Sequence, residues 1–305
     1  MKGSVKTVLL LLLLVVLLDK SVFGLDVLIV SSSDIIPYTA CIEGMKGALG
    51  GASLEIENIQ ENIDRAAETI QNTDKKQPRV VIAVGPHAAY SLSRQKTRAL
   101  RLFCMVMNPE RLLKQENLYP GVALTIPSAF QLQTIKSAFT GRTKVGVFFW
   151  GKTNQDTIDE LTREAAKLDM TIVPFPITSP GEIPDIISSS RFAIDVLLII
   201  PDDQVSSKRI VEYIIKKSLR RKIPVVGYNS WFAKNGALLS FIIDYEQIGS
   251  QTARLAKELL STDPPDNATI VYPEKISISV DLKTAKKLGV TLSETILLQA
   301  DEVIE

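Results

Sequence analysis

Residues 79–92 read RVVIAVGPHAAYSL, and this stretch decides the fold. Arg79 to Val84 is a short run of mostly branched apolar residues, typical of a strand that is buried on both faces. Gly85 and Pro86 break the run, and the residues through Leu92 have helical spacing. A buried strand followed at once by a helix predicts one unit of a parallel sheet that is covered by helices.

The same pattern recurs along the chain in two series. We expect strands at 25–30, 53–59, 79–84, 102–107 and 121–125, and again at 144–150, 170–173, 194–200 and 223–226. We expect helices between them at 38–49, 61–70, 154–168, 182–189 and 205–219. The predicted fold class is α/β, with two doubly wound parallel-sheet lobes joined by hinge strands.

The last quarter of the chain is too short for a third domain. Its expected elements are strands at 237–243 and 276–282 and helices at 245–260 and 283–288. We therefore expect these elements to return and complete the two lobes. The predicted N-terminal lobe is 25–126 plus 243–270, and the predicted C-terminal lobe is 127–242 plus 271–305.

Residues 1–24 have the layout of a secretory signal peptide. Lys2 and Lys6 precede an unbroken run of 11 leucines and valines from Val8 to Leu18, and the segment SVFG at 21–24 ends on the small residue Gly24. A retained membrane anchor is the alternative, although 11 residues fall short of the roughly 20 that a bilayer span needs. Cleavage after Gly24 leaves 281 residues with a net charge of −1, expected to be exported and periplasmic or otherwise extracytoplasmic.

Composition and charge exclude several classes of protein. Hydrophobic residues make up 46% of the chain and charged residues 23%, which excludes a disordered or disulfide-scaffold protein. The net charge of +1 provides no basic surface for nucleic acid, so no nucleic-acid partner is expected. The two cysteines, Cys41 and Cys104, are either buried thiols or a disulfide, and the spacing does not decide between them.

Polar and aromatic residues follow most of the predicted strands. In open parallel sheets ligands bind outside the carboxyl ends of the strands, so these residues are the candidate ligand-binding set. Backbone N–H groups at helix starts suit an anionic group, an aspartate suits an amine, and aromatic rings suit an apolar part. The alternative is that the serines, asparagines and aspartates cap helices and that Trp150 packs in the core. The candidates are Ser32, Ser33, Tyr38, Gly85, His87, Asn108, Trp150, Asn154, Asp202, Asp203, Tyr228 and Asn229.

No catalytic constellation is evident. His87 is the only histidine, so a zinc site lacks ligands, and there is no GxSxG elbow for a serine nucleophile. The glycine-rich stretch 43–51 matches neither phosphate-binding pattern, and its glycines are interpreted as close helix packing and a helix C-cap. We expect no enzyme activity, no metal and no cofactor.

Several motifs give the chain a family resemblance. The sequence DYEQIG at 244–249 and the ending SVDLKTAKKLG at 279–289 resemble the DYxxLG and N-x-x-A-x-x-L-G signatures of ABC transporter substrate-binding proteins, with Asp281 in place of Asn. The segment VIAVGPHAA at 81–89 resembles the family's I-x-x-x-G-T-P-A-A turn. The segment 104–109 resembles its VF…DP strand, with Asn108 in place of Asp.

The resemblance implies a type I periplasmic-binding fold, in which two lobes close on a small molecule. Known members include binders of aromatic amino acids, but the departures lie in the loops. We expect a monomeric, exported protein that binds a small molecule, an amino acid or a related compound, in the cleft between its lobes. Its expected partner is an ABC permease in the inner membrane. A sensory or scaffolding protein with the same fold is the alternative; a repressor would need a helix-turn-helix where the leader stands.

Overall fold

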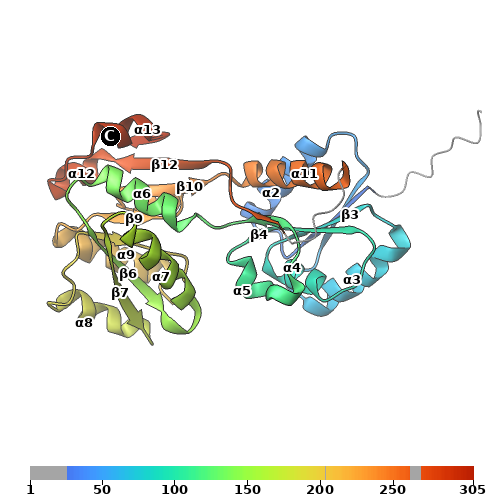
Figure 1. Cartoon of the computed structure of the whole chain (residues 1–305), viewed down its shortest axis with the longest axis horizontal. Coiled ribbons are helices and arrows are strands. Elements are labelled where there is room, and N and C mark those ends of the chain that lie inside the picture. The colour runs from blue at the N-terminus through green and yellow to red at the C-terminus, as the bar shows by residue number, and fades with distance from the viewer. Residues whose placement is uncertain (1–25, 203, 262–268) are drawn as a thin grey trace, which may run out of the picture. The chain divides into compact units, whose positions relative to one another are not determined.

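The computed structural model describes residues 26–202, 204–261 and 269–305, and the predicted leader 1–24 lies outside them. The chain forms two compact units (Figure 1). The first contains the described residues up to Leu124 together with Tyr245–Val271, and the second contains Thr125–Asp244 and Tyr272–Glu305. The chain therefore passes from one unit to the other three times.

The first unit is built on a six-stranded sheet in which all strands are parallel. The strand order is β11-β5-β4-β3-β1-β2, so the order reverses between β1 and β3. The strands are β1 (Val27–Ser31), β2 (Leu54–Asn58), β3 (Val80–Val84), β4 (Leu100–Val106), β5 (Gly121–Ala123) and β11 (Ile270–Val271).

Helices cover both faces of this sheet. The helices α2 (Ile36–Leu49) and α11 (Tyr245–Ser261) lie side by side on one face (Figure 1). On the other face α3 (Ile63–Lys76), α4 (Pro86–Ser93) and α5 (Pro109–Leu113) contribute to a core with the strands, and the 3-10 turn Gln115–Asn117 follows. Because both faces are covered, the inner strands β1, β3 and β4 are apolar at nearly every position, whereas the edge strand β2 carries two glutamates.

The second unit repeats this plan with seven strands in the order β13-β12-β10-β9-β8-β6-β7. All neighbours are parallel except β10 and β12. The strands are β6 (Lys144–Trp150), β7 (Thr171–Ile177), β8 (Val196–Leu198), β9 (Val225–Gly227), β10 (Leu239–Ile243), β12 (Ile276–Asp281) and β13 (Glu302–Ile304).

Two cores lie on opposite faces of this second sheet. Along β6, Val147 and Phe149 enter one core and Phe148 enters the other, as the two-residue period of a strand requires. The first core includes residues of α6 (Ser128–Ala138), α7 (Gly151–Ala166), α12 (Leu282–Leu288) and α13 (Glu294–Gln299). The second includes residues of α8 (Ile183–Ser188), α9 (Lys208–Arg220) and α10 (Ser230–Lys234), with a 3-10 turn at Pro180–Glu182. The predicted α/β fold with two doubly wound sheets is confirmed.

Some elements differ from the sequence-based expectation. The strand expected at 170–173 continues to Ile177 through Pro174 and Pro176. Proline has no backbone N–H group to donate. It is tolerated in β7 because this edge strand has no neighbouring strand on one side, so no ladder hydrogen bond is lost there. The helices α5, α6, α10 and α13 and the strands β11 and β13 were not expected, because short elements and weakly amphipathic helices leave little periodic signal.

Two glycines let α2 and α11 touch backbone to backbone. A Cβ atom at Gly249 would lie 1.8 Å from the carbonyl oxygen of Cys41, and one at Gly44 would lie 2.0 Å from that of Glu246. Such distances leave no room for any side chain. The close contact fixes the returning segment 245–261 to the first unit.

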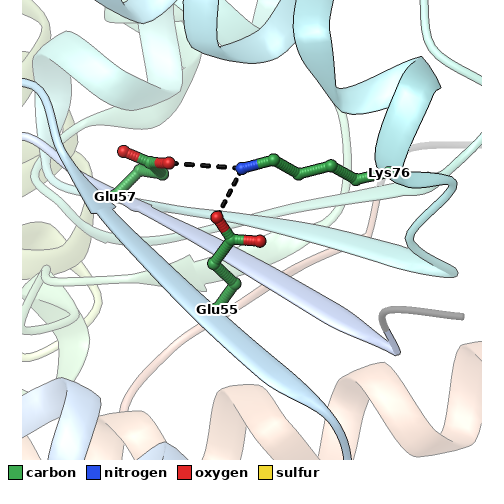
Figure 2. A network of polar contacts seen from close by, with 3 residues as sticks. All are labelled: Glu55, Glu57 and Lys76. Atoms are coloured by element: carbon green, nitrogen blue, oxygen red, sulfur yellow. Dashed lines mark hydrogen bonds and ion pairs between the residues drawn. The ribbon is translucent and has the colours of Figure 1, made fainter. Parts of the chain in front are cut away.

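The edge strand β2 carries a polar network (Figure 2). Lys76, at the end of α3, donates to Glu55 and, at 3.3 Å, to Glu57. These hydrogen bonds raise the pKa of Lys76, with that to Glu55 the largest cause. The resulting stabilisation is present at neutral pH and is lost as the pH rises through the raised pKa. All three side chains are about one-third exposed, so solvent screening keeps the contribution of these two ion pairs to stability small.

We predict that Gly249→Ala destabilises the protein strongly, whereas Gly47→Ala does not. A methyl group at Gly249 forces α2 and α11 apart, and overpacking of this kind costs about 1–3 kcal/mol or more. A methyl group at Gly47, on the same helix α2, meets nothing within 4 Å and should stabilise by up to about 1 kcal/mol. Urea unfolding of both variants measures the difference, and equal stability would contradict the packing argument.

Candidate functional site

Both sheets have the same topological switch point. The strand order reverses between β1 and β3 in the first unit and between β6 and β8 in the second. At such a point the connections leave the carboxyl ends of neighbouring strands toward opposite faces, which leaves a crevice for a ligand. The residues after these four strands are therefore the first to consider.

In the first unit Ser32 joins the two sides of the switch point. Its Oγ accepts a hydrogen bond from the backbone N–H of Ala88 at 3.0 Å, and its own N–H donates to Val84 O at 2.8 Å. Ser32 is buried. The loop after β1 is thus fixed to the end of β3 and the start of α4.

Tyr38 covers Gly85 at this point. Gly85 has φ +88°, and a Cβ there would lie 2.7 Å from Tyr38 Cζ and from Ser32 Oγ, so only glycine fits. Burial, and then the nearby charge of Glu61, raise the pKa of Tyr38. The phenol is therefore neutral near pH 7 and can donate a hydrogen bond.

Ser33 and His87 flank this arrangement. Ser33 Oγ is buried and has no hydrogen-bond partner among the described residues, while Ser33 O accepts from Ser31 Oγ at 2.7 Å. His87 is half-buried at the second position of α4. An unsatisfied buried hydroxyl costs stability, so it is a place where a ligand could supply the missing partner.

The end of β4 has unusual backbone geometry. Met105 has φ +57°, and the register with β5 shifts between Cys104 and Val106, which marks a bulge. Asn108 follows with φ +48° and precedes α5, and Met107 between them is 50% exposed. Bulges and left-handed non-glycine residues concentrate at functional edges because they redirect side chains.

In the second unit Asp202 joins the strand ends. Its Oδ2 accepts from Trp150 N at 2.7 Å and from Asn154 Nδ2 at 2.6 Å, and its Oδ1 accepts from Gln204 N and Val205 N. Asp202 is 5% exposed. Four donors fill the acceptor capacity of a carboxylate, and they tie the end of β8 to the end of β6.

A serine extends this network to β9. Ser206 Oγ accepts from Asp202 N at 3.0 Å and from the hydroxyl of Tyr228 at 3.1 Å. The Tyr228 ring also packs against Phe232, with centroids 4.7 Å apart. Tyr228 is thereby held at the carboxyl end of β9, where it is partly exposed.

Trp150 and Asn229 are the remaining candidate residues at the strand ends of the second unit. Trp150 ends β6, precedes α7 and is partly exposed. Asn229 caps α10, since its Oδ1 accepts from Trp231 N at 3.0 Å and from Phe232 N at 3.4 Å. The capping alternative therefore holds for Asn229.

The structure thus groups the candidates by unit. Ser32, Ser33, Tyr38, Gly85 and His87 lie at the first switch point, and Asn108 lies at the end of the neighbouring strand. In the second unit the hydrogen bonds gather Trp150, Asn154, Asp202 and Tyr228. Asp203 lies outside the described residues. Sequence reasoning missed Ser206 and Met105, because neither a tertiary hydrogen bond nor a positive φ leaves a local signal.

Within the described ranges, no three or more of His, Cys, Asp and Glu come close enough together to hold a metal ion. The described helices also include none with the length and apolarity to cross a membrane.

A family model described as "ABC transporter substrate binding protein" matches residues 39–304 of the chain. The chain belongs to this family. The match covers the strand-end loops of both units apart from the residues before Thr39, and it confirms the resemblance seen in the terminal motifs. Solute-binding proteins of this kind are extracytoplasmic and non-enzymatic.

One curated relative is the "Tyrosine-binding protein" of Clostridioides difficile (strain R20291). It is 28% identical over 159 residues, which is 52% of this chain. The matched segment spans 46% of that protein, about half its length.

Solved structures share the fold of this substrate-binding protein. A substrate-binding protein with adhesive properties from Clostridium difficile, in a ligand-free, open structure, has a TM-score of 0.74 at 20% identity. It is matched over 92% of this chain and 99% of its own. An ABC domain in complex with L-Trp from Streptococcus pneumonia has a TM-score of 0.66 at 17% identity, with 92% and 100% covered.

We predict that Asp202→Ala lowers the free energy of unfolding much more than Asp195→Ala. Loss of the Asp202 carboxylate leaves four donors near the switch point without their acceptor. We expect this loss to lower the free energy of unfolding by about 2–4 kcal/mol. Asp195 accepts from Thr143 N and Lys144 N at the opposite end of β6, in a more exposed setting, and its loss should cost about 1 kcal/mol. Urea unfolding measures both values; similar losses would show that Asp202 does not hold the strand ends.

Proposed function

We propose that this protein is the exported solute-binding component of an ABC transporter and that its ligand is an amino acid with an aromatic side chain. The residues at both switch points hold the ligand, and a membrane permease receives it. Family membership, together with polar and aromatic side chains at the same edge of each sheet, carries this proposal. A relative named for tyrosine and a structural neighbour with bound L-Trp support the ligand class.

The first unit supplies groups that suit the polar end of an amino acid. Ser33 Oγ lacks a partner among the described residues, and it lies on the loop whose neighbour Ser32 contacts the start of α4. A carboxylate accepts from a hydroxyl and from backbone N–H groups at a helix start. Tyr38 adds a neutral phenol and an aromatic face beside Gly85.

The second unit supplies an aromatic surface. Trp150 and Tyr228 are both partly exposed at the strand ends, and each is held by the Asp202 and Ser206 network. Rings stack on one another or meet edge to face with an added gain of about 0.5–1.5 kcal/mol. An aromatic side chain therefore gains more here than an aliphatic one.

Asp202 has a positioning role in this proposal. Asp202 or Asp203 was a candidate partner for a ligand amine, but the two oxygens of Asp202 already accept from four protein donors. Recruiting it for an amine would break these bonds in a buried setting, at about 1–3 kcal/mol for each unsatisfied donor. We therefore assign Asp202 to holding Trp150 and Asn154 in place.

Delivery of the ligand to the permease depends on the ligand binding one conformation of the protein more tightly than the others. A ligand held by residues of both units favours the conformation in which both sets contact it. The permease then distinguishes loaded from empty protein by the surfaces that this conformation presents. Export through the predicted leader places the protein in the extracytoplasmic compartment, where such a permease collects its substrate.

A thermal-shift screen of residues 25–305 tests the ligand class. Tyrosine, tryptophan and phenylalanine should each raise Tm by several degrees at about 100 times Kd, where binding adds roughly 2.7 kcal/mol. Alanine, glutamate, ribose and rhamnose serve as matched non-aromatic solutes and should raise it much less. Shifts with a sugar alone would reject the amino-acid proposal, and no shift with any solute would favour the sensory or scaffolding alternative.

The adjacent serines provide a variant test. Ser33→Ala should leave the free energy of unfolding unchanged or raise it slightly, because the lost hydroxyl is buried and makes no hydrogen bond to the described residues, and should weaken ligand binding about tenfold. Ser32→Ala should instead destabilise by about 1–3 kcal/mol, because Ala88 N loses its buried acceptor. Calorimetric titration and urea unfolding separate the two effects. Unchanged affinity in Ser33→Ala would remove Ser33 from the site.

A further inference from the structure

The first unit brings the two cysteines of the chain into contact. Cys41 lies on α2 and Cys104 on the central strand β4, 63 positions apart in the sequence. Their Sγ atoms are 3.6 Å apart, and both residues are 0% exposed. We propose that Cys41 and Cys104 form a disulfide while the exported chain folds, and that this bond links α2 covalently to the first sheet. The proposal rests on the export that the proposed function requires.

The surroundings of the pair support a crosslink. The Cys41 carbonyl oxygen lies only 1.8 Å from where a Cβ of Gly249 would be, so α2 and α11 are in direct contact beside it. Thr252 of α11 reaches Cys104 from the same side. The elements that carry the two sulfurs are therefore already packed together, and bond formation requires the sulfurs to approach to about 2.05 Å.

The pair must be oxidised before it is buried. No oxidant reaches a thiol that is fully enclosed, and burial raises the pKa of Cys104, which removes the reactive thiolate. During folding, one cysteine thiolate attacks a disulfide of an oxidoreductase and forms a mixed disulfide. The second cysteine then displaces the oxidoreductase. The two cysteines lose two protons and two electrons, and the donor disulfide takes up both to leave as a dithiol.

The crosslink lies next to the candidate site. Cys41 is one helical turn after Tyr38, and Cys104 directly precedes the bulge at Met105. Fastening α2 to β4 therefore also holds Tyr38 against Gly85. The disulfide stabilises the loops at the first switch point without contacting a ligand.

Mass spectrometry of the full chain, exported by a bacterial host, tests the proposal. The protein is denatured in iodoacetamide without reductant, and its mass is compared with that of a sample reduced first. We expect no carbamidomethyl adduct before reduction and two adducts after it. Cys41→Ala and Cys104→Ala serve as controls, and each should carry one adduct in both samples. Two adducts on the unreduced wild type would overturn the proposal.

A second measurement addresses the fastening of α2. Unfolding the wild type in reductant and refolding it in reductant should lower its Tm by several degrees, because the enclosed disulfide is exposed for reduction and a loop of about 60 residues then regains its freedom in the unfolded chain. The same treatment should leave the Tm of the double variant Cys41→Ala/Cys104→Ala unchanged. A wild-type Tm that this treatment does not move would overturn the stabilising role. Both readouts are independent of any ligand, so an exported protein with the disulfide but no amino-acid binding would reject the proposed function alone.

Discussion

The backbone contact between α2 and α11 is the constraint on which the first unit depends. Gly44 and Gly249 remove the side chains that would separate the two helices, so segments about 200 residues apart in the chain pack as one layer. This layer covers one face of the first sheet and buries Cys41 against β4. Because α11 belongs to the first unit, the chain has to leave the second unit and return to it, and both units are discontinuous.

Each unit holds its switch point together with a different polar group. In the first, the neutral hydroxyl of Ser32 accepts one backbone N–H, and the neighbouring Ser33 hydroxyl has no partner among the described residues. In the second, the Asp202 carboxylate accepts four N–H groups and joins the ends of β6 and β8. The backbone N–H of Asp202 and the hydroxyl of Tyr228, after β9, both donate to Ser206 Oγ. A buried carboxylate is tolerated only when its acceptors are filled, so the second network is internally complete and the first is not. Under the proposed function, this contrast assigns polar recognition to the first unit and an aromatic surface to the second.

Much of the fold could be predicted from the sequence because its strands are buried on both faces. Runs such as 79–84 and 144–150 are apolar at every position or nearly so, which indicates parallel sheets, and the family resemblance of the terminal motifs agreed with this. The extension of β7 through Pro174 and Pro176 could not be predicted, because it depends on β7 lying at the sheet edge. The helix α6 was missed for a related reason, since its buried face is not strongly marked in the sequence.

The candidate site also combines features that the sequence predicts with features that only the tertiary structure decides. The sequence by itself determined which residues follow the strands, because parallel strands must present their carboxyl ends at one edge. Tertiary structure alone decided their roles: Asn229 caps a helix, Asp202 accepts from four donors, and Gly85 makes room for Tyr38. It also decided that Cys41 and Cys104 meet. Local sequence encodes periodicity and turns, whereas hydrogen-bond saturation and contact depend on atoms that the chain brings together from distant segments.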